Sequence, residues 1–278
     1  MARKRWDPRH SEPRSSLPRG HREQRNAPRP SAKHSRSGPP DRVLLYGWHP
    51  VRAALENPKR RIRKLLLTEN TLRRLKDQGT ALPVEPELVS PDALSRHLPA
   101  DAVHQGLMAE ADPLPSPDIE DLSDGIALVL DQVTDPHNVG AILRSAAAFG
   151  AVGLITTSRH SPEATGVLAK SASGALEYVP IVAVSNLARG IEALKARGFL
   201  AIGLDSEADI DLSAVPLRLP LALVLGAEGR GLRQLTRTTC DRLAKFGLPG
   251  PIKSLNVSNA AALALYVAST RVTSKIPA

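Results

Sequence analysis

Polar residues whose types and spacing suit chemistry gather in two loops and a predicted helix start within residues 221–266. An apolar run leads into a glycine-rich loop that carries one carboxylate, Glu228. A second loop leads into Ser254, Asn256 and Ser258, at alternate positions ahead of an alanine-rich helical pattern. Ser and Asn oxygens accept hydrogen bonds from the unpaired N–H groups at a helix start, so these residues predict an N-terminal cap. Two loops and a helix start so close in sequence favour one shared ligand site.

An arginine, Arg144, is a further candidate for chemistry. It lies in a helical pattern that follows an Asp-Pro-His-Asn loop at residues 135–138, and it is off the apolar face of that helix. A lone arginine on a helix is most often a solvated charge. The loop just ahead, and the small neighbours Ala141 and Ala148 at helical spacing, would let a ligand or another chain approach. We therefore expect Arg144 to have a functional role.

Residues 125–278 form the domain that must position these side chains. Continuous apolar runs alternate with helical patterns, as in parallel sheets that helices cover on both faces. The expected strands are residues 126–130, 151–157, 179–184, 199–204 and, as the last, 221–225. The expected helices are residues 140–149, 162–174 and 186–197, a helix after the glycine loop and a final helix after Ser258. Ligands of such sheets bind at the carboxyl ends of the strands, and Asn138, Glu228 and Ser254 all follow strands or open helices.

A Rossmann dinucleotide-binding domain is the obvious alternative, and the motif spacing argues against it. No G-x-G-x-x-G follows the first strand, and the glycine cluster at residues 226–231 comes near the end of the chain. The glycine-rich segment of a class I methyltransferase is missing too.

A smaller α/β domain is expected at residues 41–112, followed by a linker rich in Pro, Asp and Ser at residues 113–124. Residues 44–47 lead into the first helical pattern. The predicted strands are residues 62–68, a short one within 82–89, and 103–109; the predicted helices are residues 49–57, 71–78 and 91–97. A basic run at residues 59–64 is either a solvated face or a contact for RNA.

The basic charge of the chain is concentrated in its first 40 residues. The net charge is +9, and residues 1–40 hold eleven Lys or Arg against three Asp or Glu, with seven prolines. This composition predicts a disordered tail, since it offers almost nothing to bury. Two interpretations of this tail remain: an electrostatic arm that binds nucleic acid, and a solubilising leader without a specific role. Because the rest of the chain is nearly neutral, the first interpretation is favoured.

Several classes of protein are disfavoured by composition. The single cysteine, Cys240, excludes an internal disulfide, and we expect it to be a small packing residue in a reducing compartment. No paired Cys/His spacing suits a metal, so no metal is assigned. No apolar run approaches the length that spans a bilayer, and the start of the chain lacks a secretory signal. We expect a protein of the bacterial cytoplasm with no membrane partner.

Three ordered motifs resemble those of the SpoU (TrmH-like) RNA 2′-O-ribose methyltransferases of the SPOUT superfamily. They are Asp-Pro-His-Asn-Val-Gly at residues 135–140 with Arg-Ser-Ala at 144–146, Leu-Gly-Ala-Glu-Gly-Arg-Gly at 225–231, and Ser-Leu-Asn-Val-Ser at 254–258. The front domain, with Tyr46-Gly47 near its start and Val-His-Gln-Gly at residues 103–106, resembles the L30e-like substrate-binding domain of the large-subunit rRNA subgroup.

The resemblance implies a C-terminal trefoil knot, S-adenosylmethionine as cofactor, a homodimer, and 2′-O-methylation of a guanosine in 23S ribosomal RNA. A tRNA 2′-O-methyltransferase is one alternative, and a catalytically silent RNA-binding ribosome-assembly factor with the same fold is the other. The intact Asn138, Arg144, Glu228 and Asn256 favour an enzyme.

The resemblance also implies residue roles. Arg144 would activate the ribose hydroxyl, and Asn138, Glu228, Ser254 and Asn256 would hold and orient the reacting groups. Cofactor contacts fall on Thr156, Gly226, Gly231, Phe246, Leu248 and Leu255. One departure is the Gly-Leu-Pro-Gly-Pro-Ile-Lys sequence at residues 247–253, where the family commonly has Ile-Pro-Met.

Overall fold

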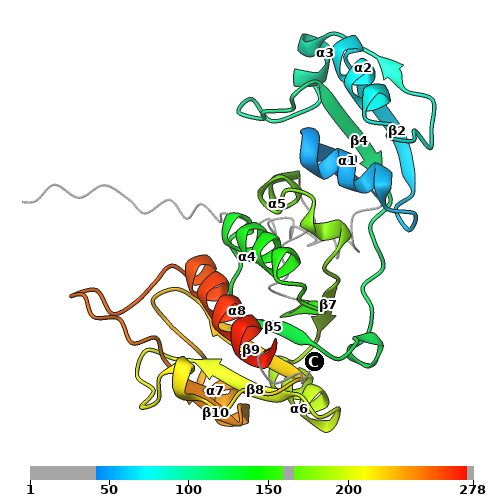
Figure 1. Ribbon diagram of the computed structural model, residues 1–278. Helices are drawn as coiled ribbons and strands as arrows, with labels where there is room; N and C mark the ends of the chain where they lie inside the picture. Colours follow the sequence, from blue (N-terminus) through cyan, green and yellow to red (C-terminus); the bar gives the residue numbers. More distant parts are fainter. Residues whose placement is uncertain (1–41, 159–165, 274–278) are drawn as a thin grey trace, which may run out of the picture. The chain divides into compact units, whose positions relative to one another are not determined.

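The computed structural model describes residues 42–158 and 166–273, which build two separate β-sheets (Figure 1). The predicted tail at residues 1–40 lies outside the described residues, and so do residues 162–165 of the helix predicted over 162–174.

The front sheet has the strand order β1 (Val43–Tyr46), β4 (Leu107–Ala111), β2 (Ile62–Leu67), β3 (Glu87–Leu88). β4 is antiparallel to both of its neighbours, while β2 and β3 are parallel. Helices α1 (Trp48–Glu56), α2 (Glu69–Asp77) and α3 (Pro91–Ser95) accompany it. The predicted alternation of strands and helices is confirmed in this part of the chain.

One strand boundary in the front sheet was predicted wrongly. The strand expected from residue 103 begins only at Leu107, because Gln105 and Gly106 have positive φ angles of 52° and 75° and turn the chain. A Cβ at Gly106 would lie 2.5 Å from the Thr68 hydroxyl, so this turn needs a glycine.

The second sheet has six strands in the order β10, β8, β9, β5, β6, β7, and every pair is parallel, as predicted. Their bounds are β5 Ile126–Asp131, β6 Gly153–Thr157, β7 Ile181–Val184, β8 Leu200–Leu204, β9 Leu221–Gly226 and β10 Arg242–Ala244. The prediction that β9 is the last strand is wrong. β10 is a three-residue edge strand in which only Ala244 is fully buried, so it carries no apolar run.

Helices cover both faces of this sheet because alternate residues of β5 face opposite sides. Leu128 and Leu130 pack with helices α4 (Pro136–Ala148), α5 (Gly166–Ser171) and α8 (Val257–Thr273). Val129 packs with α6 (Leu187–Ala196), on the side where α7 (Gln234–Thr239) also contacts α6. Three short 3-10 turns complete the fold: η1 (Ile119–Asp121), η2 (Ala175–Glu177) and η3 (Leu212–Ala214).

A buried ion pair links the front sheet to the second one. The Arg60 guanidinium, ahead of β2, lies 2.6 Å from the Glu177 carboxylate in η2, and both side chains are almost completely buried. Asn57 donates a second hydrogen bond to Glu177, and Arg60 also donates to the backbone carbonyl of Asp112. The pairing satisfies groups that would otherwise be buried without partners.

Among the described residues, no helix is long and apolar enough to cross a bilayer.

Candidate active site at the carboxyl edge of the second sheet

Asn256 is the centre of the candidate site. Its amide nitrogen donates to the side-chain oxygen of Asn138 at 3.1 Å and to the Glu228 carboxylate at 3.3 Å. Its amide oxygen accepts the backbone N–H of Ser258 at 2.9 Å, which caps the start of α8 as the sequence predicts. Because the cap requires the oxygen to face the helix, the amide nitrogen must face Asn138 and Glu228. The helix start therefore sets the orientation of the polar cluster.

The three members of this cluster come from three separate elements. Asn138 lies in the first turn of α4, three residues after the Asp135 cap, which accepts the N–H of His137. Glu228 lies in the loop after β9, and Asn256 immediately precedes α8. β5 and β9 are adjacent and in register up to Asp131 and Gly226, so the segments that follow them start side by side.

The loop that carries Glu228 is closed by its own backbone. The Gly231 N–H donates to the carbonyl of Ala227 at 2.8 Å. A Cβ at Gly226 would lie 2.1 Å from the carbonyl carbon of Gly231, so a side chain at residue 226 would prevent this closure. Gly226 therefore lets the loop fold back on the end of β9.

A cavity of about 310 Å³ lies beside the cluster, where β8, β9 and β10 end. The predicted cofactor residues that line it are Gly226, Gly231, Phe246, Leu248 and Leu255, together with the predicted catalytic residues Glu228 and Ser254. Its walls are the segments that follow β8, β9 and β10. They combine apolar side chains with backbone groups and with the charged residues Asp205, Glu228, Lys245 and Lys253. Such a lining suits a ligand with an apolar body and polar or charged edges.

The second loop of this cavity is held by Asp211. The Asp211 carboxylate accepts the backbone N–H of Gly247, and it also accepts the hydroxyl and the N–H of Ser213. These hydrogen bonds, led by that from the Ser213 hydroxyl, lower the pKa of Asp211 below its ordinary value. The carboxylate stays ionised near neutral pH and fixes the turn between Phe246 and Leu248.

Arg144 lies apart from the hydrogen-bonded cluster. It is exposed on α4, six residues beyond Asn138 and roughly 9 Å further along the helix axis. Side chains on helices point back toward the N-terminus, which is the end of α4 that carries Asn138. Within the part of the chain that the structure describes, no hydrogen bond or ion pair occupies its guanidinium. Arg144 is available to a substrate.

Four predicted site residues do not line this cavity: Asn138, Arg144 and Asn256, described above, and the predicted cofactor residue Thr156. Thr156 is buried in β6, and β5 separates that strand from β9. Parallel strands lie about 4.8 Å apart, so Thr156 is about 10 Å from the end of β9 in the sheet direction. The geometry gives no support to Thr156 as a cofactor contact.

Sequence reasoning missed an ion pair that supports the Glu228 loop. The fully buried carboxylate of Asp131, the last residue of β5, accepts hydrogen bonds from the Arg233 side chain at 2.7 Å and from the Arg233 backbone N–H at 3.0 Å. The two residues are 102 positions apart. No local pattern could have paired them, although a carboxylate ending an apolar run is an available signal.

The arrangement offers a donor and an acceptor to a bound ligand. The amide nitrogen of Asn138 and the Oε1 atom of Glu228 have no partner among the described residues. A sugar hydroxyl both donates and accepts, so it could satisfy both groups. No group of His, Cys, Asp or Glu residues in the described ranges is arranged to hold a metal ion.

Comparison with known families decides the identity of the fold. The model of the SpoU rRNA Methylase family matches residues 125–266, about half of the chain. The chain belongs to this family. A second family model, RNA 2'-O ribose methyltransferase substrate binding, matches residues 44–117. The family predicted from the three motifs is confirmed.

Curated SpoU relatives match along most of their length. The chain is 42% identical over 241 residues to the 23S rRNA (guanosine-2'-O-)-methyltransferase RlmB of Vibrio cholerae, covering 81% of this chain and 95% of the relative. It is 41% identical over 244 residues to the protein of the same name from Ralstonia nicotianae, covering 84% and 98%.

Solved SpoU structures share the architecture. The methyltransferase AviRb from Streptomyces viridochromogenes, in complex with the cofactor AdoMet, superposes with a TM-score of 0.71 at 28% identity, over 83% of this chain and 90% of that one.

Proposed function

We propose that this chain transfers a methyl group from S-adenosylmethionine to the 2′-hydroxyl of a guanosine ribose in 23S ribosomal RNA. The observation that carries the proposal is the Asn138–Asn256–Glu228 cluster beside a cavity built from two loops. Support for the substrate comes from the relatives named for 23S rRNA guanosine 2'-O-methylation, which match over nearly their whole length.

The cavity fits S-adenosylmethionine by its chemistry. Phe246, Leu248 and Leu255 supply apolar contacts, and the closed turn at Gly226 and Gly231 supplies backbone hydrogen-bonding groups. Its volume of about 310 Å³ is at the lower end of ligand sites, which range from about 300 to 1,000 Å³. When bound, the cofactor supplies an electrophilic methyl carbon on a sulfonium.

The protein's own contribution is placement and polarisation. Asn138 and Glu228 would hold the ribose, with Asn256 fixing both side chains, so that the 2′-hydroxyl faces the cofactor cavity. Correct placement would lower the barrier by several kcal/mol. The site must also accommodate loss of the hydroxyl proton.

Arg144 acts on the hydroxyl as a cation. Its high pKa makes it a poor proton acceptor, so it polarises the hydroxyl and stabilises the developing alkoxide, with an RNA phosphate accepting the proton. Ser254, on the wall of the cavity, positions groups around the reacting centre.

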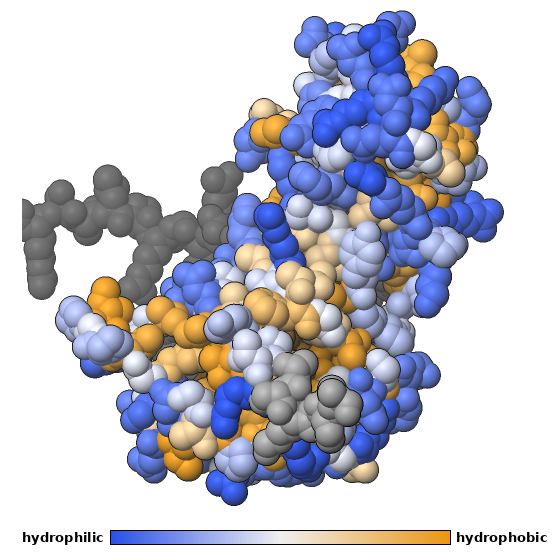
Figure 2. Space-filling view, in the orientation of Figure 1, coloured by the Kyte–Doolittle hydropathy of each residue, from blue (hydrophilic) through white to orange (hydrophobic). Residues whose placement is uncertain are grey.

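The assembly we propose is a homodimer in the bacterial cytoplasm, with a trefoil knot formed by the loops after β9 and β10. An apolar surface supports the dimer. Figure 2 shows apolar side chains gathered over α4, α8 and the loop before α8, where Ile252 and Tyr266 are exposed. Arg144 is on the same helix α4, so an interface there would enclose it.

The front domain is proposed to bind the RNA, because residues 44–117 match the substrate-binding family model. The proposed domain bounds are 41–112 for this domain, 113–124 for the linker and 125–278 for the methyltransferase domain.

The test is transfer of labelled methyl from S-adenosylmethionine to RNA by the wild type and by Arg144→Ala. We expect label in 2′-O-methylguanosine of 23S rRNA, and a fall of roughly 10²- to 10³-fold in rate for the variant, as for loss of one group that stabilises developing negative charge. Cofactor affinity, measured by calorimetry, should be unchanged.

The control variant is Arg218→Ala, an exposed arginine ahead of the amino end of β9 that lines neither cavity. Label in tRNA alone would move the assignment to a tRNA enzyme. Tight RNA binding without any transfer to naked RNA or assembly intermediates would favour the assembly factor.

A further inference from the structure

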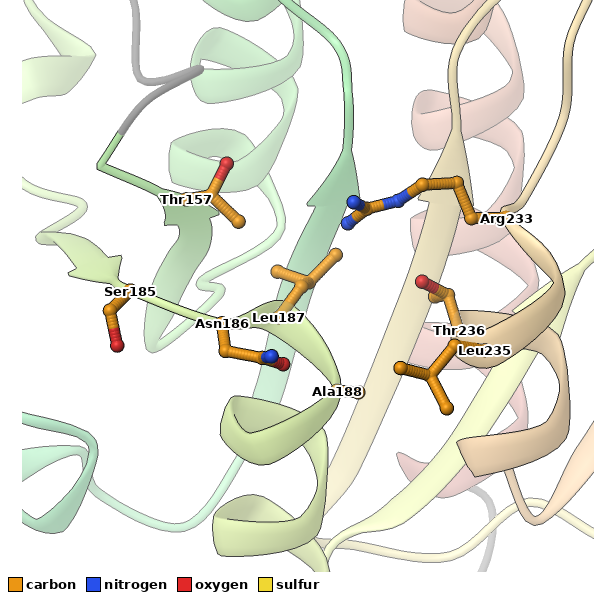
Figure 3. A pocket seen from close by; sticks show the side chains of 8 residues that line it. All are labelled: Thr157, Ser185, Asn186, Leu187, Ala188, Arg233, Leu235 and Thr236. Carbon is orange, nitrogen blue, oxygen red and sulfur yellow. The ribbon is translucent and has the colours of Figure 1, made fainter.

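A second cavity, of about 200 Å³, lies where β6 and β7 end and α6 and α7 begin. It is distinct from the cofactor cavity, and no residue lines both. Figure 3 shows Arg233, Leu235 and Thr236 on one side and Asn186, Leu187 and Ala188 on the other. None of the described residues that line it is acidic.

Thr236 indicates that the cavity takes a polar ligand. Its side chain is 1% exposed, and its hydroxyl has no hydrogen-bond partner among the described residues. No group in the described part of the chain pairs with this hydroxyl, so it is free to donate to a ligand in the cavity. In Figure 3 the hydroxyl points toward Leu187, across the cavity. A ligand that accepts a hydrogen bond there would pair with it.

Arg233 supplies guanidinium N–H donors beside that hydroxyl, while its charge is paired with the buried Asp131 carboxylate. Its Nε donates to the buried Asp131, which anchors the guanidinium, and its two terminal nitrogens have no partner within the described residues. The start of α6 forms the opposite wall, and there the Asn186 oxygen caps only the N–H of Arg189. Terminal guanidinium N–H groups and the N–H groups of a helix start both favour a phosphate.

Leu187 and Leu235 give the cavity an apolar part. Leu187 is buried, whereas Leu235 is 62% exposed at the rim. A ligand with one anionic group and one apolar body matches this division of the walls. A nucleotide of an RNA strand has both parts, since its phosphate is separated from the faces of its base and sugar.

The position of the cavity relates it to the proposed reaction. Arg233 follows Gly231 by two residues, so the loop that lines the cofactor cavity continues directly into this one. β9 ends at the cofactor cavity and β6 ends at the second one, with β5 between them. The separation across the sheet is about 10 Å, which a short single strand covers.

We propose that this cavity binds one nucleotide of the RNA strand that flanks the methylated one. The phosphate lies between Arg233, the Thr236 hydroxyl and the start of α6, and the base or sugar packs against Leu187 and Leu235. The inference rests on the proposed function for its ligand, and it assigns these residues to holding the strand rather than to catalysis.

The test compares RNA affinity among variants of the full-length protein, using a 23S rRNA fragment that the wild type methylates. Thr236→Val should weaken RNA binding roughly threefold to tenfold, as loss of one hydrogen bond does. Thr236→Ser, which keeps the hydroxyl, should bind RNA like the wild type. Leu235→Glu should weaken binding more strongly, because it places a carboxylate next to the RNA phosphate.

Two controls separate this site from the cofactor site and from misfolding. Leu219→Glu changes an exposed leucine just before the amino end of β9, and it should leave RNA affinity unchanged. All variants should bind S-adenosylmethionine like the wild type. Thr236→Val should also be at least as stable as the wild type, because the hydroxyl it removes has no protein partner.

The inference is overturned if Thr236→Val and Leu235→Glu bind RNA as tightly as Leu219→Glu does. It is also overturned if the wild type binds no RNA. If the wild type binds RNA without methylating it, the proposed function fails. The RNA affinities of the same variants then still test whether this cavity binds RNA.

Discussion

At the scale of single residues, the two ends of the Asn256 side-chain amide have different roles. Its oxygen caps α8, and its nitrogen orients Asn138 and Glu228. A substitution that keeps the helix cap but removes the amide donor can therefore show what the amide nitrogen contributes to activity.

Asn256→Asp is the substitution that does so. An aspartate still caps the helix, so stability should change by no more than about 0.5 kcal/mol. The new carboxylate cannot donate to Asn138 and repels Glu228, so methyl transfer should fall on the order of 10²-fold through misplacement. Thermal unfolding and methyl-transfer assays check both parts.

Ser258→Ala is the matched control, since it removes one hydrogen bond to Asn256 but keeps the backbone cap. If Asn256→Asp retains more than half of wild-type activity, the amide nitrogen has no positioning role.

Cys240 gives a prediction about reactivity. Burial, with a smaller contribution from Asp241, raises the pKa of its thiol from 9.0 to about 12. At pH 8 the folded protein should hold roughly a thousandfold less thiolate than the unfolded chain, so alkylation should be correspondingly slow until denaturant is added. Alkylation rates followed by mass spectrometry test this. Fast alkylation of the folded protein would contradict it.

The raised pKa of Cys240 also makes the stability of the protein depend on pH in a defined direction. The unfolded chain loses the thiol proton near pH 9 and the folded chain only near pH 12. The contribution of Cys240 to stability is therefore complete below pH 9 and is lost as the pH rises toward 12.

Sequence analysis predicted that Asn138, Glu228 and Ser254 lie at one edge of the sheet, because each follows a strand or opens a helix. In the structure Asn138 and Glu228 do come together, through hydrogen bonds to Asn256. It could not predict the pairing of Asp131 with Arg233 or of Asp211 with Gly247. Such pairs join segments far apart in sequence, and only the tertiary fold brings them together. The chemical roles of the site residues stay predictions.

At the scale of elements, the Arg60–Glu177 ion pair is the strongest candidate for joining η2 to the segment ahead of β2. Arg60→Met should destabilise the protein by about 3–5 kcal/mol, because it leaves the Glu177 carboxylate buried and unpaired. The double variant with Glu177→Met should recover much of this loss. Urea unfolding measures all three proteins.

The control pair is Arg52–Glu56, four residues apart on α1, with side chains 39% and 41% exposed. Arg52→Met should cost about 0.5 kcal/mol or less, as for surface pairs on helices. Equal losses for Arg60→Met and Arg52→Met would show that the buried pair adds nothing to stability.

Element prediction was accurate where strands are continuously apolar and poor where they are short. β5 and β9 are buried along their lengths and were identified within one residue at each end. β10 has polar ends and pairs with only one neighbour, so its sequence carries no strand pattern. The strand expected from residue 103 failed because the turn at Gln105 and Gly106 precedes it.

At the scale of the whole molecule, the predicted contribution of the basic tail is to RNA affinity. Deletion of residues 1–40 removes eleven Lys or Arg. RNA binding should weaken, and the plot of log affinity against log salt should become shallower, because fewer counterions are released. Cofactor affinity should be unchanged. An unchanged salt slope would show that the tail does not contact RNA.

Domain architecture was predictable because each part has its own pattern. The parallel sheet follows from alternating apolar runs and helices, and the family match confirms the resemblance drawn from the three motifs. The knot and the dimer came from the resemblance alone and stay proposals, since local periodicity carries no information about how loops thread or copies associate.

Residues 226–236 line one cavity with their first half and the other with their second half, and the Asp131–Arg233 pair secures them midway. Two ligands that order the same segment share the entropy cost of ordering it, so the first to bind reduces that cost for the second. Thermodynamic reciprocity then makes the enhancement equal in both directions: the factor by which cofactor tightens RNA is the factor by which RNA tightens cofactor. Release of either ligand would therefore weaken binding of the other, so the spent cofactor and the modified strand would leave more readily once one of them has gone.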